Sequence, residues 1–530
     1  MASDQHNAVV GSLLRPEAYP GQVSDVELVE TYISYLFLTG RHVYKVKKPV
    51  DYGFLDFTTL EKRRYYCHQE VELNRRLSPE VYLGVVEIRE LNGQYAIEGP
   101  GQTVEYAVKM LQLPRHRAMN ALLQEDKVSE GDIRRLAARI ADFHSRAETS
   151  PEISRLGGLE AVRQNVEENF SQTEKFLGVC LSADAFDDLV AYSRAFLEVK
   201  KELFQRRASQ GRIRDCHGDL HTAQIFLENG ISIIDCIEFN DRFRCSDVAE
   251  DIAFLAMDLD YHHRPDLSRL FIETYVQESN DSGVLDLLDF FKSYRAYVRG
   301  KVTSFRLDDP ALTDEGKEKA RASARAYFEL ARSYIRVFPR PAMVLVVGLT
   351  GTGKSTVAQE LARRWNFSYV SSDITRKALA GIAPDERRHE SFGEGIYSPE
   401  FSRRTYDAMF RQAEQCLQDG RSVVLDGTFR SAVERSRAIE AARRGGADAW
   451  IIECSLPEEE VRRRLERRTR EETSASDARW ELFHRLQQEW EPVTEAPGNR
   501  YLRLDTSAPT PETMRRLLRE LYARVLVDNS

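Results

Sequence analysis

Several features that mark specialised classes of protein are scarce in this 530-residue sequence. Its seven cysteines are scattered and form no CxxC pair, which argues against a disulfide framework or a zinc site and indicates free thiols in a reducing compartment. The longest apolar stretch, 342–349, is too short to span a bilayer, and the first ten residues lack the basic and then apolar order of a secretion signal. We therefore expect a cytoplasmic protein that does not bind a membrane.

An excess of positive charge is also lacking. The formal net charge is −9, which argues against broad electrostatic binding to nucleic acid or acidic membranes, although it leaves room for a local basic groove. Apolar residues make up 42% of the chain and charged residues 30%, a composition typical of an ordered globular protein. Because 530 residues exceed what one hydrophobic core usually supports, we expect two or three domains.

Hydrophobic patterning divides the chain into regions. Strands and helices are mixed over about 24–113, whereas 114–337 is mostly helical by its 3.6-residue period. Residues 338–341 contain two prolines and predict a linker. From 342 to 530, short apolar strands alternate with helices, which predicts a parallel sheet covered by helices. We therefore predict one domain over 1–337, with a small and a helical large lobe, and a second domain after the linker.

A glycine-rich motif, GLTGTGKS, follows an apolar strand predicted at 343–347 and precedes a helix predicted at 356–365. Glycines let backbone N–H groups turn toward phosphates, and the helix N-terminus adds a favourable dipole. Lys354 can then reach the outer phosphates, and the Ser355 hydroxyl can ligate magnesium. The predicted ATP–Mg²⁺ site comprises Gly348, Leu349, Thr350, Gly351, Thr352, Gly353, Lys354, Ser355 and Thr356.

Polar residues downstream of the motif indicate a kinase. Asp373 follows the second predicted strand, where open α/β sheets bind ligands, so it can accept a proton from an acceptor hydroxyl while Arg376 holds an anionic substituent. The alternative is that Asp373 caps the next helix. Asp426 ends the third predicted strand and is expected to steady the magnesium ion. Arg464 and Arg468 share one predicted helix face, which either closes over transferring phosphates or faces solvent.

Together these residues resemble the small P-loop kinases, namely the polynucleotide 5′-kinase, gluconate kinase and zeta-toxin group, over about 342–492. The resemblance implies that Lys354 and Ser355 lie at the phosphates and that Asp373 activates the acceptor. It also implies that the two arginines lie on a mobile lid.

A second phosphate-handling signature, HGDLH at 217–221, is followed by an apolar strand that ends at Asp235. Protein-kinase-like folds need both parts, because one Asp lies beside the acceptor hydroxyl and another holds magnesium on the nucleotide phosphates. Upstream, Lys45 and Lys47 alternate along a predicted strand and therefore share a face. Either lysine can bind phosphate and pair with Glu70, and the alternative is that both decorate an exposed edge.

This half resembles the aminoglycoside phosphotransferase and choline kinase family over about 29–335. The resemblance implies a bilobal protein-kinase-like fold with Asp219 as catalytic base, Asp235 as metal ligand and Asp251 as a structural residue. Where the family usually has Asn as a second magnesium ligand, this chain has Gln224, whose carbonyl can ligate from one methylene further out. The alternative is a degenerate kinase that binds nucleotide without turnover.

The tandem as a whole resembles bacterial bifunctional aminoglycoside phosphotransferase and ATP-binding proteins. We therefore predict an α/β and α+β protein: a protein-kinase-like bilobal domain followed by a P-loop kinase with a parallel β-sheet flanked by helices. The predicted function is transfer of the γ-phosphate of ATP, with Mg²⁺, to a hydroxyl group of a small-molecule acceptor. The alternatives are a polynucleotide 5′-hydroxyl kinase, which the negative charge does not favour, and a regulatory ATP-binding protein. Resemblance of fold names the reaction class and leaves the acceptor open.

Overall fold

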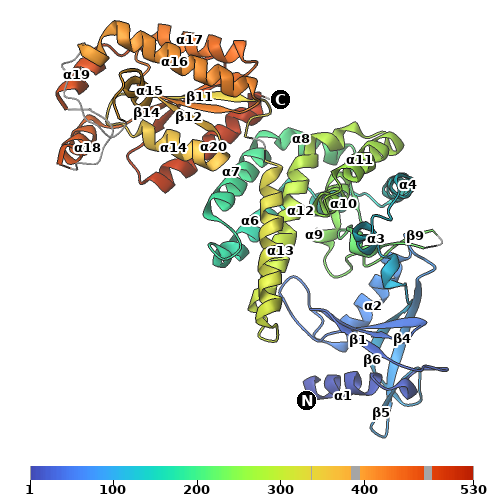
Figure 1. The fold of residues 1–530 in the computed structure, drawn as a ribbon. Coiled ribbons are helices and arrows are strands. Elements are labelled where there is room, and N and C mark those ends of the chain that lie inside the picture. Colours follow the sequence, from blue (N-terminus) through green and yellow to red (C-terminus); the bar gives the residue numbers. More distant parts are fainter. Residues whose placement is uncertain (1, 229, 336, 384–393, 471–479, 529–530) are drawn as a thin grey trace. The chain divides into compact units, whose positions relative to one another are not determined.

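A computed structural model describes residues 2–228, 230–335, 337–383, 394–470 and 480–528 (Figure 1). The chain divides into two compact units. The first comprises Met1–Leu181 and Lys200–Tyr334, and the second comprises Ser182–Val199 and Ile335–Ser530. None of the helices in the described ranges combines the length and the apolar character needed to cross a bilayer.

The described small-lobe residues of the first unit form a six-stranded antiparallel sheet in the order β1-β2-β3-β6-β4-β5. Gly40, with φ +85°, lies in the turn between the second and third strands. The elements of this lobe are α1 (Ala2–Leu13), β1 (Glu27–Glu30), β2 (Ser34–Leu38), β3 (His42–Lys47), α2 (Leu60–Asn74), β4 (Tyr82–Leu91), β5 (Gln94–Ile97) and β6 (Gln102–Leu111).

Alternation along β3 decides which side chains meet which helix. Tyr44 and Val46 belong to the core cluster that contains residues of α1, whereas Val43 belongs to the cluster that contains residues of α2. Because successive side chains of a strand point to opposite faces, Lys45 and Lys47 share the α2 face with Val43.

The large lobe is mainly helical and surrounds the segment that carries HGDLH. This segment lies between β7 and β8, and α10 beside it is buried over most of its length. A hairpin of β8 and β9, which pair in antiparallel register, follows it. The elements are α3 (Met119–Gln124), α4 (Glu130–Arg146), α5 (Pro151–Leu156), α6 (Leu159–Thr173), α8 (Lys201–Ser209), β7 (Ile213–Asp215), β8 (Ile225–Leu227), β9 (Ile231–Ile233), α9 (Asp241–Arg244), β10 (Cys245–Asp247), α10 (Val248–Tyr261), α11 (Pro265–Ser279), α12 (Leu285–Phe305) and α13 (Asp314–Ser333).

The described residues of the second unit form a five-stranded sheet in the order β12-β13-β11-β14-β15, with every neighbouring pair parallel. This confirms the predicted parallel sheet flanked by helices. Helices α16 and α17 cover one face, and α14 and α20 cover the other (Figure 1). The elements are β11 (Ala342–Val347), α14 (Lys354–Trp365), β12 (Ser368–Ser371), α15 (Ser372–Leu379), α16 (Pro399–Gln418), β13 (Val423–Asp426), α17 (Ala432–Arg444), β14 (Asp448–Ser455), α18 (Glu458–Arg470), α19 (Trp480–Gln488), β15 (Tyr501–Asp505) and α20 (Thr510–Asp528).

Helix α7 (Ala183–Val199) belongs to the second unit, although it lies in the middle of the stretch predicted as the first domain. It packs against α20, where the rings of Tyr192 and Tyr522 are 5.7 Å apart between centroids. In the predicted linker, Phe338 packs against Trp450 with ring centroids 5.4 Å apart. The second unit therefore draws on residues before position 338 for its packing.

Candidate active sites

The phosphate loop of the second unit has the backbone conformation that its glycines permit. Gly351 and Gly353 have φ values of +81° and +83°, in the left-handed region that disfavours other residues, and α14 begins at Lys354 directly after them. A Cβ atom on Gly351 would lie 2.9 Å from Cγ1 of Val461 on α18. The loop therefore packs directly beneath α18, the helix predicted to form a lid.

A short chain of hydrogen bonds holds this loop against β15 and α18. The Thr352 hydroxyl donates to the Leu349 carbonyl at 2.8 Å, and the Thr506 hydroxyl donates to the Thr352 carbonyl at 2.6 Å. Arg464 on α18 donates to the carbonyl of Thr506 at 2.7 Å. Arg464 thus lies beside the loop, as a lid arginine must, whereas the side chain of Arg468 lies outside the described residues. Sequence reasoning missed Thr506, because it belongs to no local motif.

Asp426 lies at the end of β13, in register with Val346 of the strand that leads into the phosphate loop. Its Oδ2 accepts a hydrogen bond from the Tyr369 hydroxyl at 2.7 Å. Burial, together with the Asp426 charge, raises the pKa of Tyr369, which therefore remains a donor. The other oxygen, Oδ1, is buried and has no hydrogen-bond donor in the described part of the chain. A buried oxygen left without a donor suits a bound cation.

Asp373 and Arg376 lie together at the start of α15. The Asp373 carboxylate is 3.3 Å from a guanidinium nitrogen of Arg376 and is 39% exposed. Arg376 is mostly buried, with its guanidinium carbon 4.9 Å from the centre of the Tyr397 ring. The N-cap residue of α15 is Ser371, so Asp373 is not the cap that the alternative reading required. Its position after β12 leaves the carboxylate accessible to an acceptor.

In the first unit, Lys45 and Lys47 both contact Glu70. Lys45 Nζ lies 2.8 Å from Glu70 Oε1 and 2.6 Å from Asp235 Oδ1. Lys47 Nζ lies 2.7 Å from Glu70 Oε2 and also pairs with Glu238. Burial alone would raise the pKa of Glu70, but the two lysines outweigh it and lower the pKa to about 2. Lys45 therefore joins the helix to the predicted metal ligand, whereas the completely buried Lys47 does not reach it.

The predicted metal ligands of this site also lie together. Asp235 has a φ of +64°, which non-glycine residues seldom adopt, and its backbone N–H donates to the Tyr82 hydroxyl at 3.0 Å. Gln224 Nε2 donates to Asp235 Oδ2 at 3.1 Å. The amide that replaces the family's Asn therefore reaches the carboxylate despite its extra methylene. The carboxylate is 40% exposed and thus open to a ligand.

Asp251 holds the backbone of the HGDLH loop. Its carboxylate accepts from the N–H groups of His217 at 3.2 Å and Gly218 at 2.8 Å, and it contacts His144 Nε2 at 3.1 Å. Burial would raise the pKa of Asp251, but the bond with His144 and the neighbouring histidine and amides outweigh it and lower the pKa to about 2. Gly218, at φ +82°, permits the turn that presents the next residue, Asp219.

Asp219 itself is partly accessible, with 32% of its side chain exposed, and its Oδ2 lies 3.4 Å from His221 Nε2. Burial would raise the pKa of Asp219, but the charges of His221 and Arg299 hold it well below its usual range. Arg299 comes from α12, eighty positions along the chain, and no local signal pointed to it. The carboxylate is therefore ionised and partly open to solvent.

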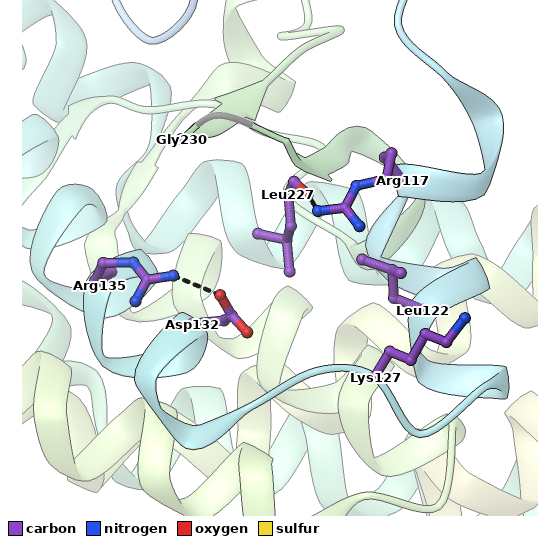
Figure 2. Close-up of a pocket in the computed structure, with 7 residues that line it drawn as sticks. All are labelled: Arg117, Leu122, Lys127, Asp132, Arg135, Leu227 and Gly230. Carbon is purple, nitrogen blue, oxygen red and sulfur yellow. Dashed lines mark hydrogen bonds and ion pairs between the residues drawn. The ribbon is translucent and has the colours of Figure 1, made fainter.

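A small polar pocket lies elsewhere in the first unit, between α3, α4 and the β8–β9 turn (Figure 2). Arg117, Lys127 and Arg135 contribute cations to its lining, and Asp132 pairs with Arg135 at 2.6 Å. Its volume is about 170 Å³. None of the predicted site residues lines this pocket, so it is separate from the predicted kinase site of the first unit.

In comparisons with known proteins, each of the two parts of the chain matches a different family model. A model of the phosphotransferase enzyme family matches residues 67–288, and a model of the AAA domain matches residues 343–493. Uncharacterized proteins of Mycobacterium tuberculosis and Mycobacterium bovis are 31% identical over 476 residues, which span 87% of this chain and 92% of theirs. The chain belongs to their family. This two-domain phosphotransferase family joins a kinase-like domain to a P-loop domain, and membership confirms the predicted tandem and its kinase class.

Solved structures of kinases resemble one part or the other of this chain. An aminoglycoside 2′-phosphotransferase-IIIa bound to GDP is 14% identical, with a TM-score of 0.35 over 59% of this chain and 93% of that one. A choline/ethanolamine kinase family protein from Mesorhizobium loti is 13% identical, with a TM-score of 0.38 over 63% and 99%. A gluconokinase from Sinorhizobium meliloti is 20% identical, with a TM-score of 0.26 over 37% and 97%.

Proposed function

We propose that the protein transfers the γ-phosphate of ATP to a hydroxyl group of a small-molecule acceptor, with one kinase site in each unit. The observation that carries the proposal is the linkage in the first unit of Lys45 to both Glu70 and Asp235, at 2.8 and 2.6 Å. Such a Lys–Glu pair beside a metal-binding Asp is what positions the nucleotide phosphates in protein-kinase-like sites. A single lysine satisfies both contacts, so Lys45 rather than Lys47 is the proposed phosphate ligand.

In this first site, Asp219 would accept the proton of the acceptor hydroxyl. The acceptor oxygen forms a bond to the γ-phosphorus, and the bond between that phosphorus and the β–γ bridging oxygen breaks to release ADP. Asp235 and Gln224 would hold Mg²⁺, the second through its side-chain carbonyl oxygen. The nearness of the two side chains, with Gln224 Nε2 3.1 Å from Asp235 Oδ2, supports this assignment. When bound, Mg²⁺ would neutralise charge on the phosphate oxygens.

In the second site, the loop amides and Lys354 would bind the phosphates, and Ser355 with Asp426 would hold Mg²⁺. The donor-free oxygen of Asp426 supports this assignment. Asp373 would receive the acceptor proton, and Arg376 would bind an anionic group on the acceptor. Arg464, which is hydrogen-bonded beside the loop, would contact the transferring phosphate from the lid helix. The role of Arg468 as a second lid arginine stays a prediction.

The alternative acceptor, a nucleic-acid 5′ end, gains no support from the basic helix α18. Arg462 lies 2.8 Å from Glu466, and Arg463 lies 3.2 Å from Glu460. These ion pairs within α18 neutralise arginine charges that would otherwise be available to a phosphate backbone. Steep loss of retention on single-stranded DNA with rising salt would instead favour that acceptor, because phosphate contacts release counterions.

The test is a screen of hydroxyl-bearing acceptors with γ-labelled ATP on the full chain and on Asp219→Ala and Lys354→Ala. Lys319→Ala serves as control, because Lys319 is 77% exposed and pairs with Glu315 one turn away. We expect Asp219→Ala to abolish transfer to one class of acceptor. Lys354→Ala should remove ATP binding by the second unit. Full-rate transfer to every acceptor by Asp219→Ala would refute the first site, and unchanged nucleotide affinity in Lys354→Ala would refute the second.

A further inference from the structure

Exposed aromatic side chains gather in one part of the small lobe. In the described residues, the aromatic side chains that are more than a third exposed are Tyr32, Tyr52, Phe54 and Tyr65. The rings of Tyr52 and Phe54 are stacked with their centroids 6.1 Å apart, and the Tyr52 hydroxyl donates to the Tyr32 carbonyl at 3.4 Å. Because burial of an aromatic ring is favourable, a group of rings left open to solvent marks a place where another molecule can bind.

The segment between β3 and α2, which carries Tyr52 and Phe54, rests on the large lobe. The Phe54 ring lies 6.1 Å from the ring of Phe239 and 6.2 Å from that of Phe243, between centroids. The side-chain amide of Asn240 donates to the Phe54 carbonyl at 2.9 Å. Phe239 and Phe243 are themselves only partly buried. We call the rings of Tyr52, Phe54, Phe239 and Phe243 the aromatic wall.

Backbone contacts hold the large-lobe part of the aromatic wall beside the HGDLH loop. The Ile237 N–H donates to the His217 carbonyl at 3.1 Å. A Cβ atom on Gly218 would lie 2.8 Å from the carbonyl oxygen of Phe243, so the two backbones are in direct contact. Asp219 follows Gly218 directly in the chain. An acceptor held at the Asp219 carboxylate would therefore lie next to the segment that carries these rings.

The charges next to Phe243 favour an uncharged ligand over a cation. A cation can bind over the face of an aromatic ring, but the guanidinium carbon of Arg242 already lies 5.2 Å from the centre of the Phe243 ring. Arg242 pairs with Glu168 on α6 at 2.7 Å, and Asp241 pairs with Arg244 at 2.7 Å, so both of these carboxylates are engaged. A second cation would be repelled by Arg242, whereas an uncharged planar ring can stack on the wall.

We propose that the acceptor of the first site carries an uncharged planar aromatic or heteroaromatic ring, in addition to the hydroxyl that is phosphorylated, and that this ring stacks on the aromatic wall. Nucleosides are one class of compound with this chemistry. The inference rests on the proposed kinase activity of the first unit. It assigns Tyr52 and Phe54 as specificity-determining residues, because their rings keep the largest exposed area in the wall.

The experiment uses the full chain with Lys354→Ala, which silences the second site, and γ-labelled ATP. Thymidine and pyridoxine are the aromatic probes, 2-deoxyribose represents thymidine without its base, and choline and kanamycin are the cationic probes. We expect Asp219-dependent transfer to at least one aromatic probe and slower transfer, at equal concentration, to 2-deoxyribose. Phe54→Leu should raise the KM for the aromatic probe about fivefold or more, with the KM for ATP unchanged, because the ring loses a stacking partner.

Conservative variants separate stacking from a loss of folding. Phe54→Trp and Tyr52→Phe each keep a ring in place and should therefore keep the KM for the aromatic probe. Tyr65→Leu on α2 is the matched control, because Tyr65 is 57% exposed and its ring packs on Tyr66, which is not part of the aromatic wall. We expect this control to leave the KM for the aromatic probe unchanged.

Calorimetric titration of thymidine and of pyridoxine at saturating ADP, into the Lys354→Ala protein and its Phe54→Leu and Phe54→Trp variants, decides the inference if no probe is phosphorylated. Binding that Phe54→Leu weakens and Phe54→Trp retains supports the inference even then, whereas the absence of Asp219-dependent transfer counts against the kinase activity. Transfer restricted to 2-deoxyribose, choline or kanamycin would overturn the inference. So would the absence of binding by both aromatic probes, or binding that Phe54→Leu leaves unchanged.

Discussion

Replacing Asp188 with alanine is expected to destabilise the P-loop unit, although Asp188 lies 154 positions before that unit's sheet begins. Asp188 on α7 accepts a hydrogen bond from Arg364 Nε on α14 at 2.8 Å, and both side chains are at most 2% exposed. The same guanidinium donates to the backbone carbonyl of Asp184 at 2.7 Å and lies 3.1 Å from its carboxylate. Helix α7 is thus tied to the second unit by a buried ion pair as well as by its contact with α20.

The magnitude follows from the burial of the pair. Removing one member of a buried ion pair costs about 3–5 kcal/mol when the remaining charge is uncompensated; because Arg364 keeps the Asp184 carboxylate at 3.1 Å, we expect the lower end of that range, about 3 kcal/mol. For a unit of about 200 residues, 1 kcal/mol lowers the Tm by about 2–4 °C, so the Tm of the second unit should fall by about 10 °C. Asp184→Ala, which keeps the backbone contact with Arg364, should lower it less.

Tryptophan fluorescence provides the assay, because the chain's four tryptophans, at 365, 450, 480 and 490, all belong to the second unit. Their thermal transition therefore reports that unit selectively. Glu160→Ala is the control, since Glu160 lies on α6 of the first unit and is 83% exposed. A tryptophan transition in Asp188→Ala that coincides with that of the unaltered protein would refute the assignment of α7 to the P-loop unit.

Three further predictions concern the sites. Gly351→Ala should weaken ATP binding to the second unit, measured by titration calorimetry. The alanine would have to adopt a positive φ, and its Cβ would lie 2.9 Å from Val461 Cγ1. Unchanged affinity would contradict the packing of the loop. Tyr369→Phe should lower the free energy of unfolding by about 1–2 kcal/mol without Mg²⁺, because Asp426 loses its donor, and a loss undiminished by Mg·ADP would count against magnesium binding. Burial raises the pKa of Glu250 from 4.5 to about 6, so this group adds stability as the pH falls. The free energy of unfolding relative to that of Glu250→Gln, measured with urea, should therefore rise by about 1.5 kcal/mol from pH 7 to pH 4.5, and a fall would contradict the raised pKa.

Local pattern in the sequence was sufficient to predict the parallel sheet of the second unit and the reaction class. The strand, glycine loop and helix around Lys354 are contiguous, so their spacing alone predicted the phosphate loop that the structure contains. The alternation of strands and helices after position 342 likewise predicted a parallel sheet, because parallel strands need crossover connections. HGDLH and Asp235 lie within one short stretch, and the family comparison agrees with the kinase class that they indicated.

What only the tertiary structure decided are contacts between residues that are far apart in the chain. Lys45 and Lys47 are equivalent in sequence, and they differ only because Asp235 meets one and Glu238 meets the other, 190 and 191 positions away. Arg299, whose charge lowers the pKa of Asp219, lies on α12, which packs against α10, and no motif encodes that packing. The same reason explains why α7 packs with the second unit. Spacing predicts which residue types are near one another locally, whereas burial of whole helix faces decides which distant side chains complete a site.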